Sequence, residues 1–344
     1  MNLNQLIRPC IKAMKPYSSA RDEFKSQDQN LVFLDANENP FANGLNRYPD
    51  PQQQLLKDKL AELKGVEPNQ ILLGNGSDEV LDLLFRVFCT PNKDAMLTLT
   101  PTYAMYGVLA NLNAVEQQTV ALTADFQIDV EAVLNATQPN TKLLFVCSPN
   151  NPSGNTMNVI AIKRILDNFN GIVVIDEAYI DFTDATSWLK YLSAYPNLVV
   201  TQTLSKAYGL AGIRLGICYA SSEIIAVLNK IKPPYNINIL TQKAALEVLS
   251  DRTTTQEQVR IILSERDTLI QNFQNIPWIE TLFPTDANFI LMRVDDANLR
   301  YEQLKQKGII VRNRTNQPLC ENCLRISVGT PQENMKLINV FKTL

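Results

Sequence analysis

The chain has 344 residues, of which 45% are apolar and 19% are charged, so it is long enough for about two domains with sizeable cores. A net charge of −3 without a basic run argues against a nucleic-acid-binding protein. The absence of histidine excludes a Ser-His-Asp triad, a Cys-His dyad and a histidine-ligated metal site. General acid–base chemistry must therefore fall to Lys, Tyr, Asp, Glu or Cys side chains.

The N-terminal sequence contains no apolar stretch long enough for a signal peptide or a membrane span, so we expect a cytoplasmic protein without a membrane partner. Six cysteines in a chain of this length indicate reduced, mostly buried thiols. Cys320 and Cys323 form a single CxxC pair. Because no second pair accompanies it, incidental spacing is favoured over the alternative of a zinc or redox site, and no metal is expected.

An N-terminal arm is expected over residues 1–35. A short helix is predicted over Leu3–Ile7 and a break at Pro9, and the polar run Ser18–Asn30 is predicted to be irregular. The apolar stretch Leu31–Leu34 predicts a short strand. Two turn-rich stretches and then a helix are predicted at Asp35–Pro40, Arg47–Pro51 and Gln52–Lys64.

Strand and helix patterns alternate between Gln70 and Tyr219. Strands are predicted at Ile71–Leu73, Ala95–Leu99, Ala114–Val120, Lys142–Cys147, Ile172–Ile175, Leu198–Thr201 and Leu215–Tyr219. Helices are predicted between several of them, at Glu79–Phe88, Tyr103–Leu112, Val159–Phe169 and Trp188–Ala194. This alternation is typical of an α/β fold with a mostly parallel seven-stranded sheet between helices, which we assign to a large domain over residues 36–235.

A smaller α/β domain is predicted over residues 236–344, after the proline-rich stretch Lys232–Tyr235. Its predicted helices are Thr241–Leu249, Thr253–Phe273, Leu299–Lys307 and Gln332–Phe341, and its strands are Asn288–Arg293, Gly308–Val311 and Cys323–Val328. The default place for a ligand is the cleft between two such domains.

Lys206 follows an apolar strand and a hydroxyl-rich turn, and small residues surround it in the sequence. A lysine that is partly desolvated in this way has a more accessible neutral amine, which can form a Schiff base with an aldehyde cofactor. A surface lysine on a loop is the alternative interpretation of this stretch alone.

The stretch Gly74–Glu79 joins a predicted strand to a predicted helix. Its two glycines allow a close backbone approach, and the helix N-terminus presents free N–H groups to an anion such as a phosphate. Ser77 could bind that phosphate or simply cap the helix. The spacing matches neither a Walker motif nor GxGxxG, so nucleotide binding is not indicated.

Polar side chains also follow the other strands. Asp176 ends a β-branched run, and an aspartate there stays ionised only beside a cation or a strong donor. Tyr179 offers a phenol three residues later, Arg214 a charge-assisted bond to a phosphate, and the turn Ser148–Gly154 an amide. A phosphate cradle, a carboxylate, a phenol, an amide and an amine together suit one ligand, pyridoxal 5′-phosphate.

With these residues in place, the sequence resembles the fold-type I pyridoxal-phosphate aminotransferases, and among them the histidinol-phosphate aminotransferase family. Each motif is weak alone, but nine of them in the family's order are specific, and they extend over nearly the whole chain. The motifs are Lys15–Tyr17, Asn37–Pro40, Arg47–Pro49, Gly74–Glu79, Pro101–Tyr103, Ser148–Gly154, Asp176–Tyr179, Ser205–Arg214 and Leu324–Gly329.

The resemblance implies a role for each cofactor residue. Lys206 would form the Schiff base and later carry a proton, and Asp176 would pair with the ring nitrogen. Asn151 and Tyr179 would bond the ring oxygen, while Tyr103 would stack on the ring. The implied phosphate site consists of Ser77, Asp78, Ser205 and Arg214. Tyr48 would reach the cofactor phosphate of a partner subunit, which implies a homodimer.

The resemblance also implies the substrate residues. Arg325 would bind the carboxylate of glutamate or 2-oxoglutarate, Arg312 with Tyr17 would hold the phosphate of histidinol phosphate, and Asn37 belongs to the same substrate-binding set. Two arginines suit substrates that each carry anions. A structural ion pair is the alternative for Arg312 and Arg325, and Arg314 competes with Arg312 for the phosphate.

The implied activity is a transaminase reaction (EC 2.6.1.9) of histidine biosynthesis, from L-histidinol phosphate and 2-oxoglutarate to imidazole-acetol phosphate and L-glutamate. Three alternatives share the cofactor site or the fold. They are a broad aromatic aminotransferase, a phosphothreonine-type decarboxylase and a non-catalytic sensor domain of a transcription regulator. The last is disfavoured, because the short N-terminal arm is too small and too neutral for a DNA-binding domain.

Overall fold

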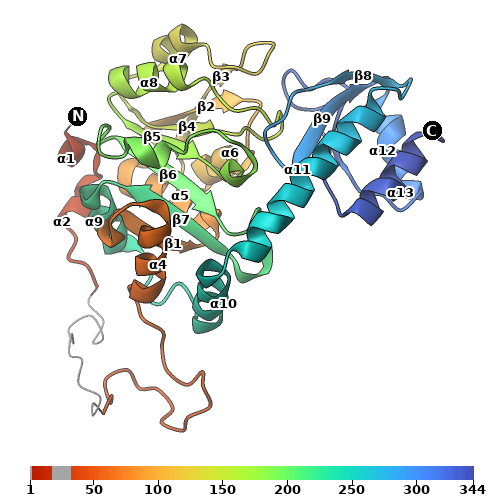
Figure 1. Ribbon diagram of the computed structural model, residues 1–344. Coiled ribbons are helices and arrows are strands. Elements are labelled where there is room, and N and C mark those ends of the chain that lie inside the picture. Colours follow the sequence, from red (N-terminus) through yellow and green to blue (C-terminus); the bar gives the residue numbers. More distant parts are fainter. Residues whose placement is uncertain (1, 18–31) are drawn as a thin grey trace.

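The computed structural model describes residues 2–17 and 32–344, and its larger part is built on a seven-stranded sheet (Figure 1). The strands are β1 (Ile71–Asn75), β2 (Ala95–Thr100), β3 (Glu116–Ala121), β4 (Thr141–Cys147), β5 (Ile172–Asp176), β6 (Leu198–Thr203) and β7 (Leu215–Ala220). Their order is β1-β7-β6-β5-β4-β2-β3, and only β7 runs antiparallel to its neighbours. The predicted mostly parallel seven-stranded sheet is confirmed.

Helices cover both faces of this sheet, as its sequence requires. Side chains alternate between the faces of a strand, so Leu143 and Phe145 of β4 belong to one hydrophobic core and Leu144 and Val146 to the other. The helices of the first core include α5 (Ser77–Phe88), α6 (Met105–Leu112) and α9 (Ser222–Ile231). The helices of the second core include α4 (Gln54–Lys64), α7 (Val130–Ala136), α8 (Val159–Asn168) and α10 (Ile239–Ser250).

A second sheet lies beyond the long helix α11 (Thr253–Phe273), which runs between the two parts of the molecule in Figure 1. Its four antiparallel strands have the order β10-β11-β9-β8. They are β8 (Ile279–Leu282), β9 (Phe289–Val294), β10 (Arg312–Asn313) and β11 (Cys323–Ser327), and α12 (Ala297–Gln306) and α13 (Pro331–Phe341) accompany them. This sheet has a hydrophobic core of its own, which supports our proposal of a second domain; the boundaries after residues 35 and 235 stay predictions.

The N-terminal region forms α1 (Leu3–Leu6) and α2 (Pro9–Ala13), so Pro9 begins a helix directly after the predicted break. Residues 32–53 contain no helix or strand and extend away from the large sheet (Figure 1). The strand predicted over Leu31–Leu34 is therefore wrong for residues 32–34; Leu31 and the Ser18–Asn30 segment lie outside the described residues. No helix of the described part of the chain is long and apolar enough to cross a membrane.

Two other local predictions are wrong. Gly308–Val311 is not a strand, because the N–H groups of Gly308 and Ile309 bond the carbonyls of Lys305 and Leu304 and cap α12 instead. The helix predicted over Trp188–Ala194 is a single 3₁₀ segment, η3 (Trp188–Tyr191). The sequence analysis also did not predict β8, α7 or α9.

Gly216 lets β7 pass directly against the turn between β1 and α5. A Cβ at this position would lie 2.5 Å from the carbonyl carbon of Gly76 and closer still to the backbone nitrogen of Ser77. These neighbours are backbone atoms, which cannot move aside as a flexible side chain can. Gly216 therefore fixes the position of the turn that begins α5.

We expect Gly216→Ala to lower the free energy of unfolding by about 1–3 kcal/mol, because the added methyl group overpacks a backbone contact. Urea unfolding followed by circular dichroism measures the change. Gly212→Ala is the matched control, because a Cβ at Gly212 meets no atom within 4 Å. Equal stability of the two variants would contradict the conclusion that Gly216 is needed for the close contact with the turn before α5.

Candidate active site

The carboxyl ends of the central strands meet at one cleft of about 640 Å³, its solvent-open mouth included. Cys147 of β4 pairs with Asp176 of β5, and Asp176 pairs with Thr201 of β6, so the polar residues that follow these strands come together. The residues that line the cleft are Ser77, Asp78, Tyr103, Cys147, Asn151, Asp176, Ala178, Tyr179, Thr203, Ser205, Lys206, Ala211 and Arg214. Every residue predicted to contact the cofactor is among them except Tyr48.

The first turn of α5 forms an anion cradle at one end of the cleft. Gly76 has a φ of +82°, which favours glycine, and no side chain caps the helix at this position. A Cβ at Gly76 would lie 2.6 Å from Nη2 of Arg214, so the guanidinium covers the turn closely. Free N–H groups at Ser77 and Asp78 beside a guanidinium form a site for a phosphate.

Asp176 lies at the end of β5 and is only 4% exposed. Its Oδ2 accepts a hydrogen bond of 2.8 Å from the hydroxyl of Tyr106, whereas Oδ1 has no hydrogen-bond partner among the described residues. Burial raises the pKa of this carboxyl group, and the Tyr106 hydroxyl opposes that rise. A buried carboxylate oxygen without a donor, in the wall of a cavity, suits a ligand that brings a protonated nitrogen.

Lys206 lies on the turn after β6 and remains accessible from the cleft. Its Nζ is 5.8 Å from the centre of the Tyr179 ring. Burial lowers the pKa of Lys206, the positive charge of Arg325 lowers it further, and Asp176 acts in the opposite direction. The neutral, nucleophilic amine is therefore more populated at a given pH than in an ordinary lysine.

Asn151 connects the cofactor side of the cleft to the small sheet. Its Nδ2 donates to the hydroxyl oxygen of Tyr179 at 3.4 Å, and its Oδ1 accepts a hydrogen bond from Nη1 of Arg325. The hydroxyl of Tyr103 donates to Asp78 at 3.2 Å on the opposite side. The amide, the phenol and the stacking ring that the sequence predicted thus lie around one cavity.

Three arginines from the small sheet lie close together beyond Asn151. Arg312 and Arg325 are directly paired across β10 and β11, and Arg314 follows two residues after Arg312. Among the described residues none of the three forms an ion pair. Burial and then the charge of Arg314 lower the pKa of Arg325 to about 10, and burial and then Arg312 lower the pKa of Arg314. Unneutralised cations that repel one another form a strong site for an anion.

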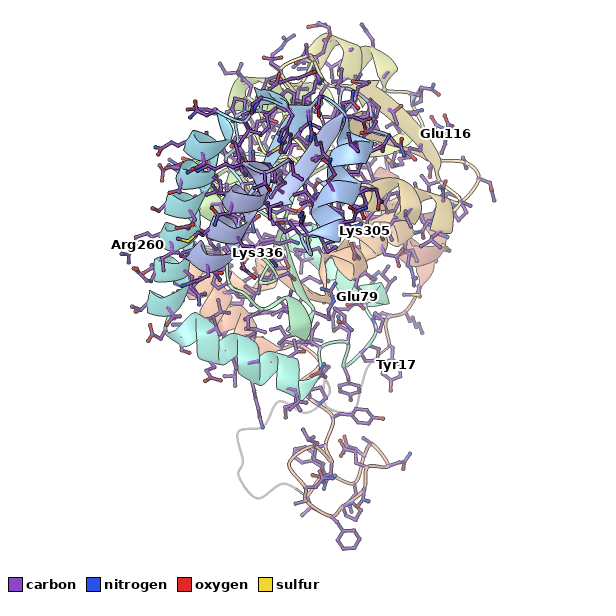
Figure 2. All side chains as sticks on the ribbon, turned by 90° about the vertical axis from the view of Figure 1, so that its right-hand side faces the viewer. Tyr17, Glu79, Glu116, Arg260, Lys305 and Lys336 are labelled. Atoms are coloured by element: carbon purple, nitrogen blue, oxygen red, sulfur yellow. The ribbon has the colours of Figure 1, made fainter. Side chains whose placement is uncertain are left out.

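Three predicted site residues lie away from the Lys206 cleft in the structure: Tyr17, Asn37 and Tyr48. Tyr48 stacks on Tyr235 with ring centres 4.5 Å apart, and both line a separate cavity together with Asn37. Tyr17 is 71% exposed and lies on the arm, below the small-sheet helices that carry Lys305 and Lys336 in Figure 2. One subunit therefore does not bring these three residues to the Lys206 cleft.

The structure adds two residues that the sequence analysis missed. The hydroxyl of Tyr106 donates to Asp176 on the side away from the cleft. In the sequence, only its position three residues after Tyr103, on the same side of a helical turn, could have indicated this role. Phe289 supports Arg325, whose guanidinium lies 5.1 Å from the ring centre, and it meets Tyr179 edge-on at 5.1 Å. No pattern in the β9 sequence distinguishes Phe289 from an ordinary core residue.

The CxxC pair, Cys320 and Cys323, belongs to no metal-binding group in the described part of the chain. Cys320 and Cys323 are buried free thiols, and the described residues contain no group of three or more side chains that could hold a metal ion. A metal site with two buried thiols alone would lack the usual four ligands.

The sequence pattern of the family described as Aminotransferase class I and II matches residues 27–341, and the seven-stranded sheet and its lysine-containing cleft agree with it. The chain therefore belongs to the class I and II aminotransferases.

Within this family, relatives that are 50–59% identical to this chain are named histidinol-phosphate aminotransferase. A histidinol-phosphate aminotransferase from Flavobacterium psychrophilum is 59% identical over 343 residues, which cover 100% of this chain and 99% of the relative. The crystal structure of the histidinol-phosphate aminotransferase from Clostridium acetobutylicum superposes with a TM-score of 0.81 at 26% identity, over 87% of this chain and 90% of that chain. The enzyme from Sinorhizobium meliloti, in complex with pyridoxal-5′-phosphate, shares the fold with a TM-score of 0.79 at 24% identity, over 86% of this chain and 83% of that chain.

The cleft fits pyridoxal 5′-phosphate, the cofactor of the family that the resemblance indicated. The N–H groups of α5 with Arg214 suit its phosphate, and the unpartnered Oδ1 of Asp176 suits its ring nitrogen. Lys206 and Tyr103 line the same cleft and would offer an amine to its aldehyde and an aromatic face to its ring.

The lowered pKa of Lys206 predicts the pH dependence of cofactor attachment. Below its pKa the lysine is protonated and unreactive, so the attachment rate should rise with pH and reach its plateau at a lower pH than for a free lysine side chain. Borohydride reduction followed by mass spectrometry measures attachment to the cofactor-free protein.

Arg325→Gln removes the second cause of the low pKa of Lys206, so the pH profile of the attachment rate should move to higher pH. Arg260→Gln is the control, because Arg260 is exposed and pairs with Glu257 on α11, and it should leave the profile in place. A wild-type profile that coincides with that of free lysine would contradict the prediction.

Proposed function

We propose that the protein transfers the amino group of L-histidinol phosphate to 2-oxoglutarate and yields imidazole-acetol phosphate and L-glutamate. The observation that carries this proposal is the cluster Arg312, Arg314 and Arg325, three cations without an acidic partner in the described chain, next to the lysine cleft. Both substrates are anionic and use the same site in turn. A cationic cluster of this kind suits both a carboxylate and a phosphate.

Lys206 is the proposed residue for covalent attachment and proton transfer. The bound cofactor supplies the electron sink for the negative charge that develops at the substrate Cα. In the amino-transfer step Lys206 Nζ would take the proton from the substrate Cα, and in the reverse step it would give the proton back to Cα. Asp176 would hold the ring nitrogen, and Asn151 with Tyr179 would hold the ring oxygen.

The chain's other residues would orient the ligands. The cofactor phosphate would lie on Ser77, Asp78, Ser205 and Arg214, and Tyr103 would fix the ring plane. In this arrangement each anionic or polar end of the cofactor meets a group of opposite character.

Arg325 is the proposed partner of the substrate carboxylate, because it already donates to Asn151 at the edge of the cleft. Arg312 is the proposed partner of the histidinol phosphate group. It lines an open cavity together with Arg325, whereas Arg314 is half-buried. Tyr17 and Asn37 remain proposed substrate residues, and both would have to come from a partner subunit.

A homodimer is the proposed assembly. Large apolar side chains are exposed on the segment that extends from the large sheet, including Leu34 at 86% and Phe41 at 80% exposure. Exposed apolar residues in such a group indicate a protein interface. Tyr48 belongs to the same segment, so a partner's segment would bring Tyr48 to the cofactor phosphate of this subunit. A cytoplasmic location stays a prediction.

Comparison of three amino donors tests the substrate. We expect kcat/KM to be highest for histidinol phosphate, lower for phenylalanine and lowest for phosphothreonine, with no release of carbon dioxide from any of them. A preference for phenylalanine would favour the broad aromatic aminotransferase, and carbon dioxide from phosphothreonine would favour the decarboxylase.

Two arginine variants test which residue binds the substrate phosphate. Loss of a charged hydrogen bond should raise KM for histidinol phosphate about 10- to 100-fold in Arg312→Gln, and much less in Arg314→Gln. Histidinol without its phosphate is the internal control, because its KM should not respond. The reverse order of the two variants would assign the phosphate to Arg314, and Arg260→Gln again serves as the surface control.

Mixed dimers test the proposed contribution of Tyr48. Tyr48→Ala and Lys206→Ala proteins should each be impaired, but a mixture refolded together should regain activity, since roughly a quarter of its sites would combine both native residues. A mixture of Asp176→Ala with Lys206→Ala is the control and should stay inactive, because both residues line the cleft of one chain. Absence of recovery in the first mixture would contradict a shared site.

A further inference from the structure

Tyr106 is a buried tyrosine behind the cleft. It lies in the first turn of α6, its side chain is fully buried, and it is not among the residues that line the cavity. Its hydroxyl donates to Oδ2 of Asp176 at 2.8 Å. Tyr106 therefore contacts the carboxylate that faces the cavity but cannot itself touch a ligand there.

The position of the Tyr106 hydroxyl is fixed by aromatic packing. The ring stacks on Phe145 of β4 at 4.8 Å with an interplanar angle of 15°, and Phe145 stacks in turn on Phe85 of α5 at 5.3 Å. The ring edge meets Tyr103 at 5.6 Å and 84°. Tyr106 thus connects two residues of the cofactor site, the carboxylate of Asp176 and the stacking ring of Tyr103.

The hydrogen bond leaves the two carboxylate oxygens unequal. Tyr106 satisfies Oδ2, whereas Oδ1 has no partner among the described residues and remains for a donor from the ligand. A hydrogen bond to the ionised form of a carboxyl group stabilises the charge and lowers its proton affinity. Tyr106 is the largest of the groups that oppose burial, so without it burial would favour the neutral acid more strongly.

A tyrosine is a suitable permanent hydrogen-bond donor to Asp176 in a chain without histidine. Burial and the neighbouring Asp176 raise the pKa of Tyr106 well above its ordinary value, so its hydroxyl keeps its proton at every working pH. Cys147, which also lies beside Asp176, has its pKa raised chiefly by burial and remains a neutral thiol. A histidine would titrate near neutral pH, whereas Tyr106 donates the same hydrogen bond throughout.

We propose that Tyr106 is a positioning residue that keeps Asp176 ionised and directs Oδ1 to the cofactor, so that the shared proton resides on the ring nitrogen. The inference rests on the proposed use of pyridoxal 5′-phosphate for amino transfer. A protonated ring nitrogen withdraws electrons more strongly from the reacting carbon than a neutral one. Tyr106 would therefore influence the rate through Asp176 and without any contact to substrate.

Tyr106→Phe removes the hydroxyl and keeps the ring. Tyr219→Phe is the matched control, because Tyr219 is also fully buried but its hydroxyl has no hydrogen-bond partner among the described residues. In protein loaded with ¹⁵N-labelled pyridoxal 5′-phosphate, the ring-nitrogen chemical shift should move toward the unprotonated value in Tyr106→Phe only.

Kinetics separate this role from a purely structural one. The kcat of Tyr106→Phe should fall about 10- to 100-fold, while KM for both substrates stays within about twofold. A ¹⁵N shift and a kcat equal to those of Tyr219→Phe would overturn the proposal. The proposal would also be overturned if Tyr106→Phe lost activity only in proportion to weaker cofactor binding or lower stability while its ring nitrogen stayed protonated.

Incorporation of 4-aminophenylalanine at position 106 provides a second measurement if Tyr106→Phe does not fold. An aniline N–H is a weaker donor than a phenol O–H, so the ¹⁵N shift should move part of the way toward the unprotonated value; no change in the shift would overturn the proposal. The ¹⁵N readout needs bound cofactor but no substrate. Failure of the wild-type protein to use histidinol phosphate would therefore contradict the proposed function and leave the result on Tyr106 separate.

Discussion

The buried carboxylate of Asp176 imposes the strongest constraint on the site. Removal of a carboxylate from water costs several kcal/mol unless donors or cations meet it, and this one is 4% exposed at the end of a central strand. The hydroxyl of Tyr106 is the largest of the groups that oppose the effect of burial on the pKa of Asp176, and Oδ1 has no hydrogen-bond partner among the described residues. The protonated ring nitrogen of the cofactor would complete this electrostatic arrangement.

Positive charge is in excess on the opposite side of the cleft. Arg325 is half-buried beside other arginines, and burial followed by the charge of Arg314 lowers its pKa to about 10. Burial lowers the pKa of Lys206 most and the charge of Arg325 lowers it further, so the residue that would bind substrate also favours the neutral amine that would bind cofactor. An anionic substrate would neutralise Arg325 and thereby change the charge that Lys206 experiences. In the proposed mechanism, this one guanidinium would couple substrate binding to the chemistry of the Lys206 amine.

Regular elements were predictable where a single period dominated the sequence. The β-branched run of β5 and the 21-residue helix α11 were predicted closely, because burial on both faces and a 3.6-residue repeat are visible without tertiary information. The strand predicted at Gly308–Val311 was wrong. The N–H groups of Gly308 and Ile309 bond carbonyls at the end of α12, so they are not available to a neighbouring strand. The predicted cofactor residues other than Tyr48 lie around one cleft because parallel strands place their carboxyl ends at one edge.

The sequence by itself determined which chemical groups follow the strands: the amine of Lys206, the carboxylate of Asp176 and the glycine-containing turn before α5. Those groups follow short apolar runs, and local pattern suffices to find them. Only the tertiary structure decided that Tyr106 lies behind Asp176 and that Arg314 faces Arg325 rather than an acidic residue. These contacts depend on packing between elements far apart in the chain. The hydroxyl of Tyr106 meets a carboxylate 70 residues away, and its ring stacks on Phe145 of β4.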